Sequence, residues 1–165
     1  CPYTKTSLNR SHFRMTVCQE SHASVSFVTQ TILRYRDWFL EITPVLPAAE
    51  AFYKTILILF PHLAEDRVPI IIDEIQRTLK PLFVQAGLMI GQFHEKCNEP
   101  GLWNQDFRPL HSPLPLLAIR HMVPTDFPFL RHEPVFLEAY LKNYGQQIPQ
   151  RWLSAVQLQR NLFGL

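Results

Sequence analysis

The sequence predicts an α/β (α+β) domain with a four-stranded mixed sheet and helices mostly on one face, in the ferredoxin-like manner. Three observations support this prediction: strand-like and helix-like segments alternate in the first half, two apolar strands follow each other in the second half, and the chain ends in two helical segments. The expected order is β-α-β-α-β-β-α-α. With 165 residues, of which 47% are hydrophobic and 18% charged, residues 1–165 are expected to form a single domain, with 146–165 as a C-terminal helical extension.

The first three elements are predicted to be a strand, a helix and a strand. Residues 12–19 alternate apolar and polar side chains, a pattern typical of a half-buried strand. Residues 25–42 carry apolar side chains at three- and four-residue steps, and Pro44 follows this helix as a stop signal. Residues 52–60 are rich in β-forming side chains and end at Pro61, which predicts a buried strand.

The second half is expected to add a long helix, a β-hairpin and two further helices. An apolar stripe runs along residues 66–86, where Pro81 predicts a kink. Residues 88–94 and 115–121 form short apolar runs that are expected to pair antiparallel. The remaining helices are predicted at 133–144 and 149–161.

Composition and charge argue against several classes of protein. A net charge of +2, without a run of basic residues, argues against a nucleic-acid partner. The apolar runs are all shorter than the roughly 18 residues of a membrane span, so no membrane partner is expected. Three widely spaced cysteines are interpreted as reduced thiols, which predicts a cytoplasmic protein. Motifs for dinucleotides, P-loop phosphates, the serine-hydrolase elbow and zinc proteases are absent.

Side chains able to carry chemistry are concentrated between positions 94 and 126. If 88–94 and 115–121 pair antiparallel, the two ends of this hairpin lie roughly 20 Å apart, so His94 and His121 cannot bind one metal ion. Two clusters therefore remain as alternatives. The cluster at the loop end of the hairpin consists of His94, Cys97, Arg108 and His111. The cluster at the end of the fourth strand consists of Arg120, His121 and Asp126.

The strand-end cluster predicts a haem site. His121 follows an apolar run at 115–119, and an imidazole beside an apolar surface suits the iron ligand of a flat, apolar cofactor. Arg108 or Arg120 is expected to pair with a haem propionate or a substrate carboxylate, and Asp126 to orient a polar substrate or relay a proton. The further cofactor-binding candidates are Arg120, His111 and His94.

Two other hypotheses remain open. The loop-end cluster is able to bind a metal ion through His94, His111 and Cys97 or Asp106, or to use Cys97 as a nucleophile with His94 as its base. Alternatively, the aromatic and proline-rich window is a non-catalytic surface for a small ligand or a protein partner. For the haem enzyme, the expected substrate is a small amine or amino-acid derivative, and a homodimer is considered as the assembly.

Three blocks of sequence carry a resemblance. CPYTKTSL near the start, QFHEKCNEPGL, and FRPLHSPLPLLAIRHMVPTDFPFL together resemble an uncharacterised bacterial domain family often found beside natural-product genes. In addition, Cys1-Pro2 and LLAIRHMVP are similar to features of small haem proteins that N-hydroxylate guanidino groups. The second resemblance implies an iron-containing oxidoreductase with His121 as the proximal haem ligand.

Overall fold

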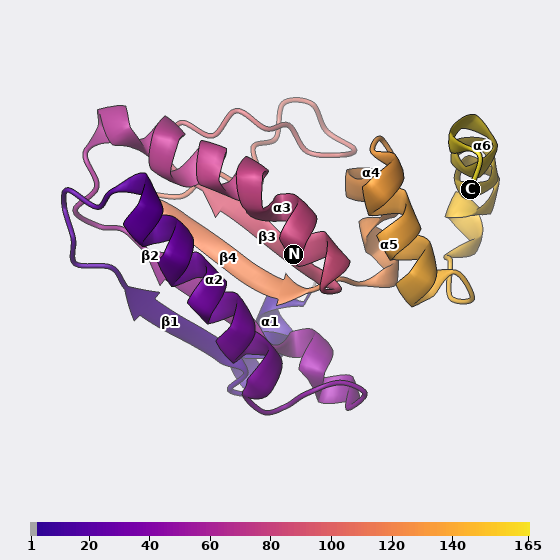
Figure 1. The fold of residues 1–165 in the computed structure, drawn as a ribbon, viewed down its shortest axis with the longest axis horizontal. Coiled ribbons are helices and arrows are strands. Elements are labelled where there is room, and N and C mark those ends of the chain that lie inside the picture. Colours follow the sequence, from indigo (N-terminus) through magenta and orange to yellow (C-terminus); the bar gives the residue numbers. More distant parts are fainter. Residues whose placement is uncertain (1–2) are drawn as a thin grey trace.

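A computed structural model describes residues 3–165, which form a mixed α+β fold around a four-stranded sheet (Figure 1). The strands are β1 (Phe13–Val17), β2 (Thr55–Leu59), β3 (Leu88–Phe93) and β4 (Leu116–His121). Each of the four predicted strands is thereby confirmed to within a few residues. Cys1 and Pro2, which carry part of both resemblances, lie outside the described residues.

The strand order is β1-β2-β4-β3, with β1 parallel to β2 and β4 antiparallel to both of its neighbours. The predicted pairing of the third and fourth strands is confirmed, since Leu88 lies opposite His121. With α3 (Ile75–Gln85), strands β2 and β3 form the split βαβ unit of ferredoxin-like proteins, because antiparallel β4 lies between them. Helix α2 (Val25–Glu41) connects β1 to β2, and these two strands lie directly beside each other. Only the half of the sheet that contains β2, β4 and β3 therefore has ferredoxin-like connectivity.

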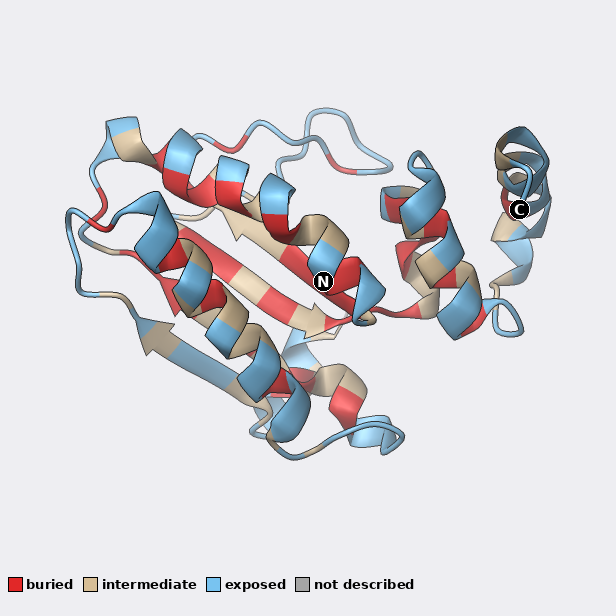
Figure 2. Ribbon diagram, viewed as in Figure 1, coloured by how far each residue is buried: buried red, intermediate tan, exposed pale blue. Residues whose placement is uncertain are grey.

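Helices α2 and α3 cover the same face of the sheet, as the sequence predicts (Figure 1). Figure 2 shows the buried residues of both helices on the sides that face the strands. These residues and the inward side chains of the sheet form the larger core, which includes Ile32, Phe83 and Ile119. The side chain of Ser24 caps α2 by accepting a hydrogen bond from the backbone N–H of Phe27 at 3.1 Å.

A smaller core lies beside the sheet and is built on α4 (Phe127–Leu130), α5 (Pro134–Tyr144) and α6 (Leu153–Phe163). The last two helices are predicted from sequence, whereas α4 and the short α1 (Thr4–Asn9) are additional. None of the helices within residues 3–165 is both long enough and apolar enough to span a membrane.

Two tyrosines of α5 fix the segment that follows β4. The hydroxyl groups of Tyr140 and Tyr144 donate hydrogen bonds to the backbone carbonyls of Pro124 and Met122, respectively. Burial raises the pKa of each phenol to about 12, so both remain donors throughout the physiological pH range.

The predicted long helix is irregular at its start and not at Pro81. A π-helical segment, Pro69–Glu74, precedes α3, and α3 continues through Pro81. Proline removes one helical hydrogen bond, but the buried apolar face of α3, with Leu79 and Phe83, keeps the helix on the sheet. π-Helical turns are frequent at functional sites, and this one carries Asp73.

Candidate functional site

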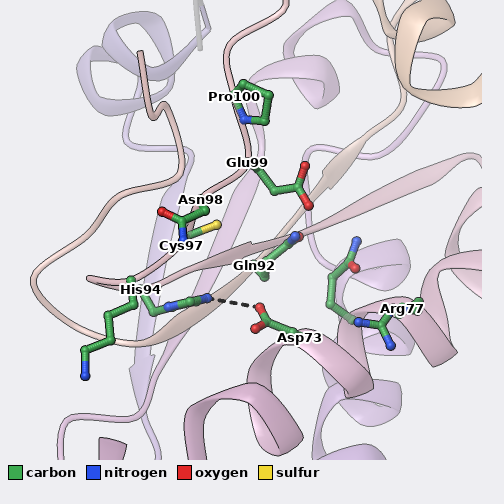
Figure 3. Close-up of a pocket in the computed structure, with 10 residues that line it drawn as sticks. Asp73, Arg77, Gln92, His94, Cys97, Asn98, Glu99 and Pro100 are labelled. Atoms are coloured by element: carbon green, nitrogen blue, oxygen red, sulfur yellow. Dashed lines mark hydrogen bonds and ion pairs between the residues drawn. The ribbon is translucent and has the colours of Figure 1, made fainter. Parts of the chain in front are cut away.

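A cavity of about 500 Å³ lies where β3 leaves the sheet (Figure 3). One wall comes from the π-helical segment and the start of α3, a second from β3 and its continuation, and a third from residues 96–100. The walls are largely polar. The side chains used below are Asp73, Arg77, Gln92, His94, Cys97 and Glu99.

His94 and Asp73 form the central pair of this cavity. Nε2 of His94 lies 3.0 Å from Oδ1 of Asp73, and His94 is only 7% exposed. A carboxylate only accepts hydrogen bonds, so Nε2 carries the proton and Nδ1 is the basic nitrogen. Nδ1 has no hydrogen-bond partner in the part of the chain that the structure describes. The pair therefore has the arrangement that orients a histidine for general-base catalysis.

The backbone of His94 is held by the loop that returns toward β4. The N–H of His94 donates to the carbonyl of Leu110 at 3.3 Å, and the N–H of Ser112 donates to the carbonyl of His94 at 3.3 Å. His94 thereby forms a β-bridge with His111. The N–H of Cys97 donates to the same carbonyl at 3.2 Å, which folds the third wall over the cavity.

Cys97 lies in this third wall, and Figure 3 shows it on the same side of the cavity as His94. Burial raises the pKa of the Cys97 thiol, and a hydrogen bond from the Glu99 backbone offsets this only in part. A thiol in such surroundings is protonated near neutral pH and is a weak nucleophile. The geometry therefore supports a chemical role for His94 better than it supports one for Cys97.

Arg77 and Glu99 place opposite charges around the cavity (Figure 3). Both are exposed, and neither forms an ion pair with another residue between positions 3 and 165. Lys96, in contrast, is engaged by Glu65 at 2.6 Å. The cavity thus offers one cation and one anion that are available to a ligand.

The other side chains predicted to act at the loop end lie outside the cavity. His111, Asp106 and Arg108 are exposed, and the Arg108 guanidinium donates to two carbonyls of its own loop. Within residues 3–165, no group of three or more His, Cys, Asp or Glu side chains is arranged to hold a metal ion. The structure therefore places His94 and Cys97 in the lining of one cavity and leaves Asp106, Arg108 and His111 elsewhere.

Sequence reasoning missed Asp73 and Arg77. Both lie in the segment that is predicted as one regular helix, where charged side chains are normally assigned to the solvated face. They are four residues apart on a helix that leads directly into the strand ending near His94. A crossover helix packs beside the strand that follows it. The four-residue spacing of Asp73 and Arg77 therefore indicates that both side chains lie on one side of the helix, near the end of β3.

His121 lies at the opposite end of the β3–β4 pair, in closed apolar surroundings. Its ring centre is 4.8 Å from that of Phe39 and 6.2 Å from that of Phe52. The residue is 4% exposed, and within the described chain neither ring nitrogen has a hydrogen-bond partner. Burial, with a smaller contribution from Lys54, lowers the pKa of His121 to about 4.

Lys54 is a second buried polar residue at this end, to which sequence reasoning assigned no role. It directly precedes Thr55, which lies opposite Arg120 in the register of β2 and β4, and its charge acts on the neighbouring His121. Lys54 is 1% exposed; its Nζ donates to the carbonyl of Ile42 at 2.6 Å and lies 4.5 Å from the ring centre of Phe39. Burial lowers the pKa of Lys54 to about 8.

Arg120 and Asp126 are separated from the His121 ring by the sheet itself. Successive side chains of a strand point to opposite faces, so Arg120 lies on the face opposite His121. Two guanidinium nitrogens of Arg120 each lie 2.7 Å from a carboxylate oxygen of Asp126. Asp126 also accepts a hydrogen bond from the backbone N–H of Val123 at 2.9 Å. This ion pair stabilises the turn after β4, and Asp126 is buried within it.

The surroundings of His121 do not fit a haem. An iron ligand needs a ring nitrogen that faces a slot for a planar macrocycle, whereas phenyl rings pack against this imidazole. His121 lines neither the cavity at His94 nor a second cavity of about 280 Å³ between the end of β1 and α2. His94 and His111 lie at the other end of the hairpin. The predicted haem-binding residues are therefore not brought together.

Comparison with known proteins identifies a family without an assigned activity. No curated protein and no solved structure shows significant similarity to this chain. Residues 1–155 match the family described as "Domain of unknown function (DUF6875)". This match covers most of the chain, including the strands, α5 and every side chain that lines the cavity. The chain therefore belongs to the DUF6875 family.

Proposed function

We propose that the cavity at His94 is an active site in which His94, oriented by Asp73, transfers a proton during a reaction of a small zwitterionic molecule. One observation carries this proposal: a buried histidine that is paired with a carboxylate lies in the wall of a polar cavity of about 500 Å³. Cavities of this size suit metabolite-sized ligands. A histidine in such a wall is a common general base.

His94 acts through Nδ1 in this proposal. Nδ1 accepts the α-proton of the substrate as the Cα–H bond breaks, the electron pair of that bond stays on the α-carbon beside the carboxylate, and the resulting imidazolium keeps its Nε2–H bond to Asp73. Asp73 orients the ring and fixes the tautomer in which Nδ1 is free to accept the proton. When the product forms, Nδ1 returns the proton.

The charges around the cavity support a substrate with both a carboxylate and an ammonium group. Arg77 offers a planar guanidinium for the carboxylate, and Glu99 offers an anion for the ammonium group. This substrate class agrees with the expectation of an amino-acid derivative. A cytoplasmic location and a place in natural-product biosynthesis stay predictions.

Binding tests the substrate class. A panel of amino acids is compared by NMR titration with matched carboxylates that lack the amine and matched amines that lack the carboxylate. We expect some zwitterions to shift the signals of Arg77 and His94, and both single-charge analogues to bind at least roughly tenfold more weakly, which corresponds to about 1.4 kcal/mol for one lost ionic contact. Equal binding of an analogue and its zwitterion would refute this substrate class.

Proton transfer is tested separately with the zwitterions that bind. In D₂O, a general base next to the substrate carbon exchanges the α-proton for deuterium, which NMR detects as loss of the α-proton signal. We expect His94→Gln to slow this exchange by roughly 10²–10⁴-fold, and His111→Gln, which changes an exposed histidine of the same loop, to leave it unchanged. Equal exchange in His94→Gln and the wild type would rule out His94 as the base.

The haem enzyme is a second candidate, favoured by the resemblance and by the apolar run that precedes His121. An absorption spectrum of the freshly purified protein tests it, because bound haem gives an intense band in the near ultraviolet. A band that is present in the wild type and lost in His121→Ala would support the haem assignment in spite of the packing around His121.

A further inference from the structure

The reaction proposed for the cavity at His94 places negative charge on the substrate, and this charge needs a partner. When the Cα–H bond breaks and Nδ1 takes the proton, the electron pair of that bond spreads from the α-carbon onto the carboxylate oxygens. Hydrogen-bond donors at such oxygens commonly give the largest single contribution to catalysis. Arg77 is exposed, so solvent screens the charge that it offers. A second donor, less exposed than Arg77, is therefore expected beside His94.

Gln92 lies where such a donor is expected. Side chains two residues apart in an extended chain point to the same face of the sheet, at positions roughly 7 Å apart, so Gln92 precedes His94 on the face that α3 covers. Both residues line the cavity, and in the view of Figure 3 Gln92 lies between His94 and Arg77. An α-amino acid whose Cα–H bond points to His94 therefore directs its carboxylate toward Gln92 and Arg77.

The side-chain amide of Gln92 is free to bind a ligand. Its neighbours on this face are apolar, because Ile90 precedes it in β3 and Leu117 lies opposite it in β4. Both neighbours are buried, whereas Gln92 is half-buried. Among residues 3–165, no group forms a hydrogen bond with this amide. A polar group between apolar neighbours needs a hydrogen-bond partner, and the cavity is the side from which one can come.

Gln76, a second glutamine in the lining of the cavity, has a different role. Its Nε2 donates a hydrogen bond to the backbone carbonyl of Ile90 at 3.0 Å. Because β3 is an edge strand, this contact joins α3 to the free edge of the sheet. The donor of Gln76 is thus occupied by the fold itself, whereas the donor of Gln92 is available to a substrate.

We propose that Gln92 is a catalytic residue of this site, whose amide N–H donates a hydrogen bond to a carboxylate oxygen of a bound α-amino acid. This inference rests on the proposed function of His94. The proton moves to Nδ1, the electron pair of the broken bond moves toward the carboxylate, and return of a proton to the α-carbon restores the Cα–H bond. No oxidant, reductant or second reactant is required. The hydrogen bond from Gln92 strengthens as negative charge grows on the oxygen, so it stabilises the transition state more than the bound substrate.

The test compares Gln92→Met with the wild type, using as the probe the amino acid whose α-proton exchanges fastest in D₂O with the wild type. Methionine has nearly the same length but no donor. We expect exchange at saturating amino acid to slow by roughly 10²–10³-fold, while the affinity falls by no more than roughly tenfold. Exchange that is equally fast in both proteins would overturn the role of Gln92 and leave His94 as the base. A wild type that exchanges no α-proton would overturn the proposed function, and this inference with it.

The matched control is Gln76→Met, the same substitution in the same cavity. This variant loses the hydrogen bond to Ile90, so we expect a lower free energy of unfolding in urea but an unchanged exchange rate. An equal loss of exchange in both variants would overturn the proposal, because movement of β3 would then explain it. If Gln92→Met does not fold, NMR of the wild type in H₂O decides instead. The side-chain amide protons of Gln92 are expected to shift when the same amino acid binds, and binding without this shift would overturn the proposal.

Discussion

The two ends of the β3–β4 pair each carry a buried histidine, and they differ in what surrounds the ring. At one end, His94 has a carboxylate partner and a place in the wall of a polar cavity. At the other end, both ring nitrogens of His121 lack a partner within residues 3–165, and two phenyl rings pack against the imidazole. The two residues are almost equally buried, so burial alone does not distinguish a chemical role from a structural one.

The difference follows from where each strand end lies in the fold. β3 is an edge strand, so the chain beyond it is free to fold into a loop that leaves space beside α3. β4 is a central strand, and its last residue points into the layer between the sheet and α2. A histidine at the end of a central strand is therefore closed in by packing, whereas one at the end of an edge strand remains accessible to a ligand.

The largest expected effect is that of Asp73→Asn at the His94 end. The amide keeps the size of the side chain but no longer fixes the tautomer in which Nε2 carries the proton and Nδ1 is free. We expect proton exchange of the bound zwitterion to slow by roughly 10²–10⁴-fold, with little change in its affinity. The rate and the affinity are both measured by NMR. Glu74→Gln, which neutralises the exposed neighbouring carboxylate, is the control, and an equal loss in both variants would contradict a specific role for Asp73.

The next largest effect is structural and concerns Asp126. Asp126→Ala leaves the Arg120 guanidinium without its partner and Val123 N–H without its acceptor. Because removing one partner of a buried ion pair is costly, we expect the free energy of unfolding to fall by about 3 kcal/mol. Urea unfolding measures this change. Unchanged ligand affinity at the His94 cavity is expected in the same variant, and its loss would indicate that Asp126 acts on the site.

These two carboxylates also show how far the sequence predicts the site. The strands and the antiparallel hairpin follow from residue patterns that repeat within one element, so they are predicted to within a few residues. Asp73 and His94 are 21 residues apart in the sequence, and their contact depends on how α3 packs on β3. A pattern within one element therefore does not predict this contact. The prediction that Arg120 and His121 share one site was wrong for a simpler reason. Adjacent side chains of a strand point to opposite faces of the sheet.

His121 gives a smaller effect, which depends on pH. The pKa of His121 is about 4 in the folded chain and near 6.5 in the unfolded chain, so the unfolded chain binds the extra proton between these values. Protonation of His121 therefore does not change the free energy of unfolding above pH 6.5. It lowers this free energy as the pH falls from 6.5 to 4. At the acid end, we expect this loss to reach about 3 kcal/mol.

The variant His121→Leu separates the effect of His121 on the pH dependence of stability from the effect of the Asp and Glu side chains, which also titrate at acid pH. Leucine removes two unpaired buried nitrogens, so the variant is expected to be at least as stable as the wild type near neutral pH. Urea unfolding is measured for both proteins at several pH values, and the difference between them is expected to grow as the pH falls. Parallel curves for the two proteins would show that His121 is not closed off from water as the structure places it.

Lys54→Met is expected to give the smallest effect and tests the same end of the molecule independently. Methionine leaves the carbonyl of Ile42 without its hydrogen bond, which costs about 1 kcal/mol, but it also removes a charge that burial disfavours, so the net change in stability near neutral pH is small. The pKa of Lys54 is about 8 in the folded chain, below its ordinary value of 10.5, so wild-type stability rises as the pH increases from 8 to 10.5. The variant lacks this rise.

Removing the cation also raises the pKa of His121, which moves the acid-dependent loss of stability to higher pH. If neither change appears in urea unfolding, the two residues are not electrostatic neighbours, and the contrast between the two ends of the hairpin would then rest on the His94 cavity alone.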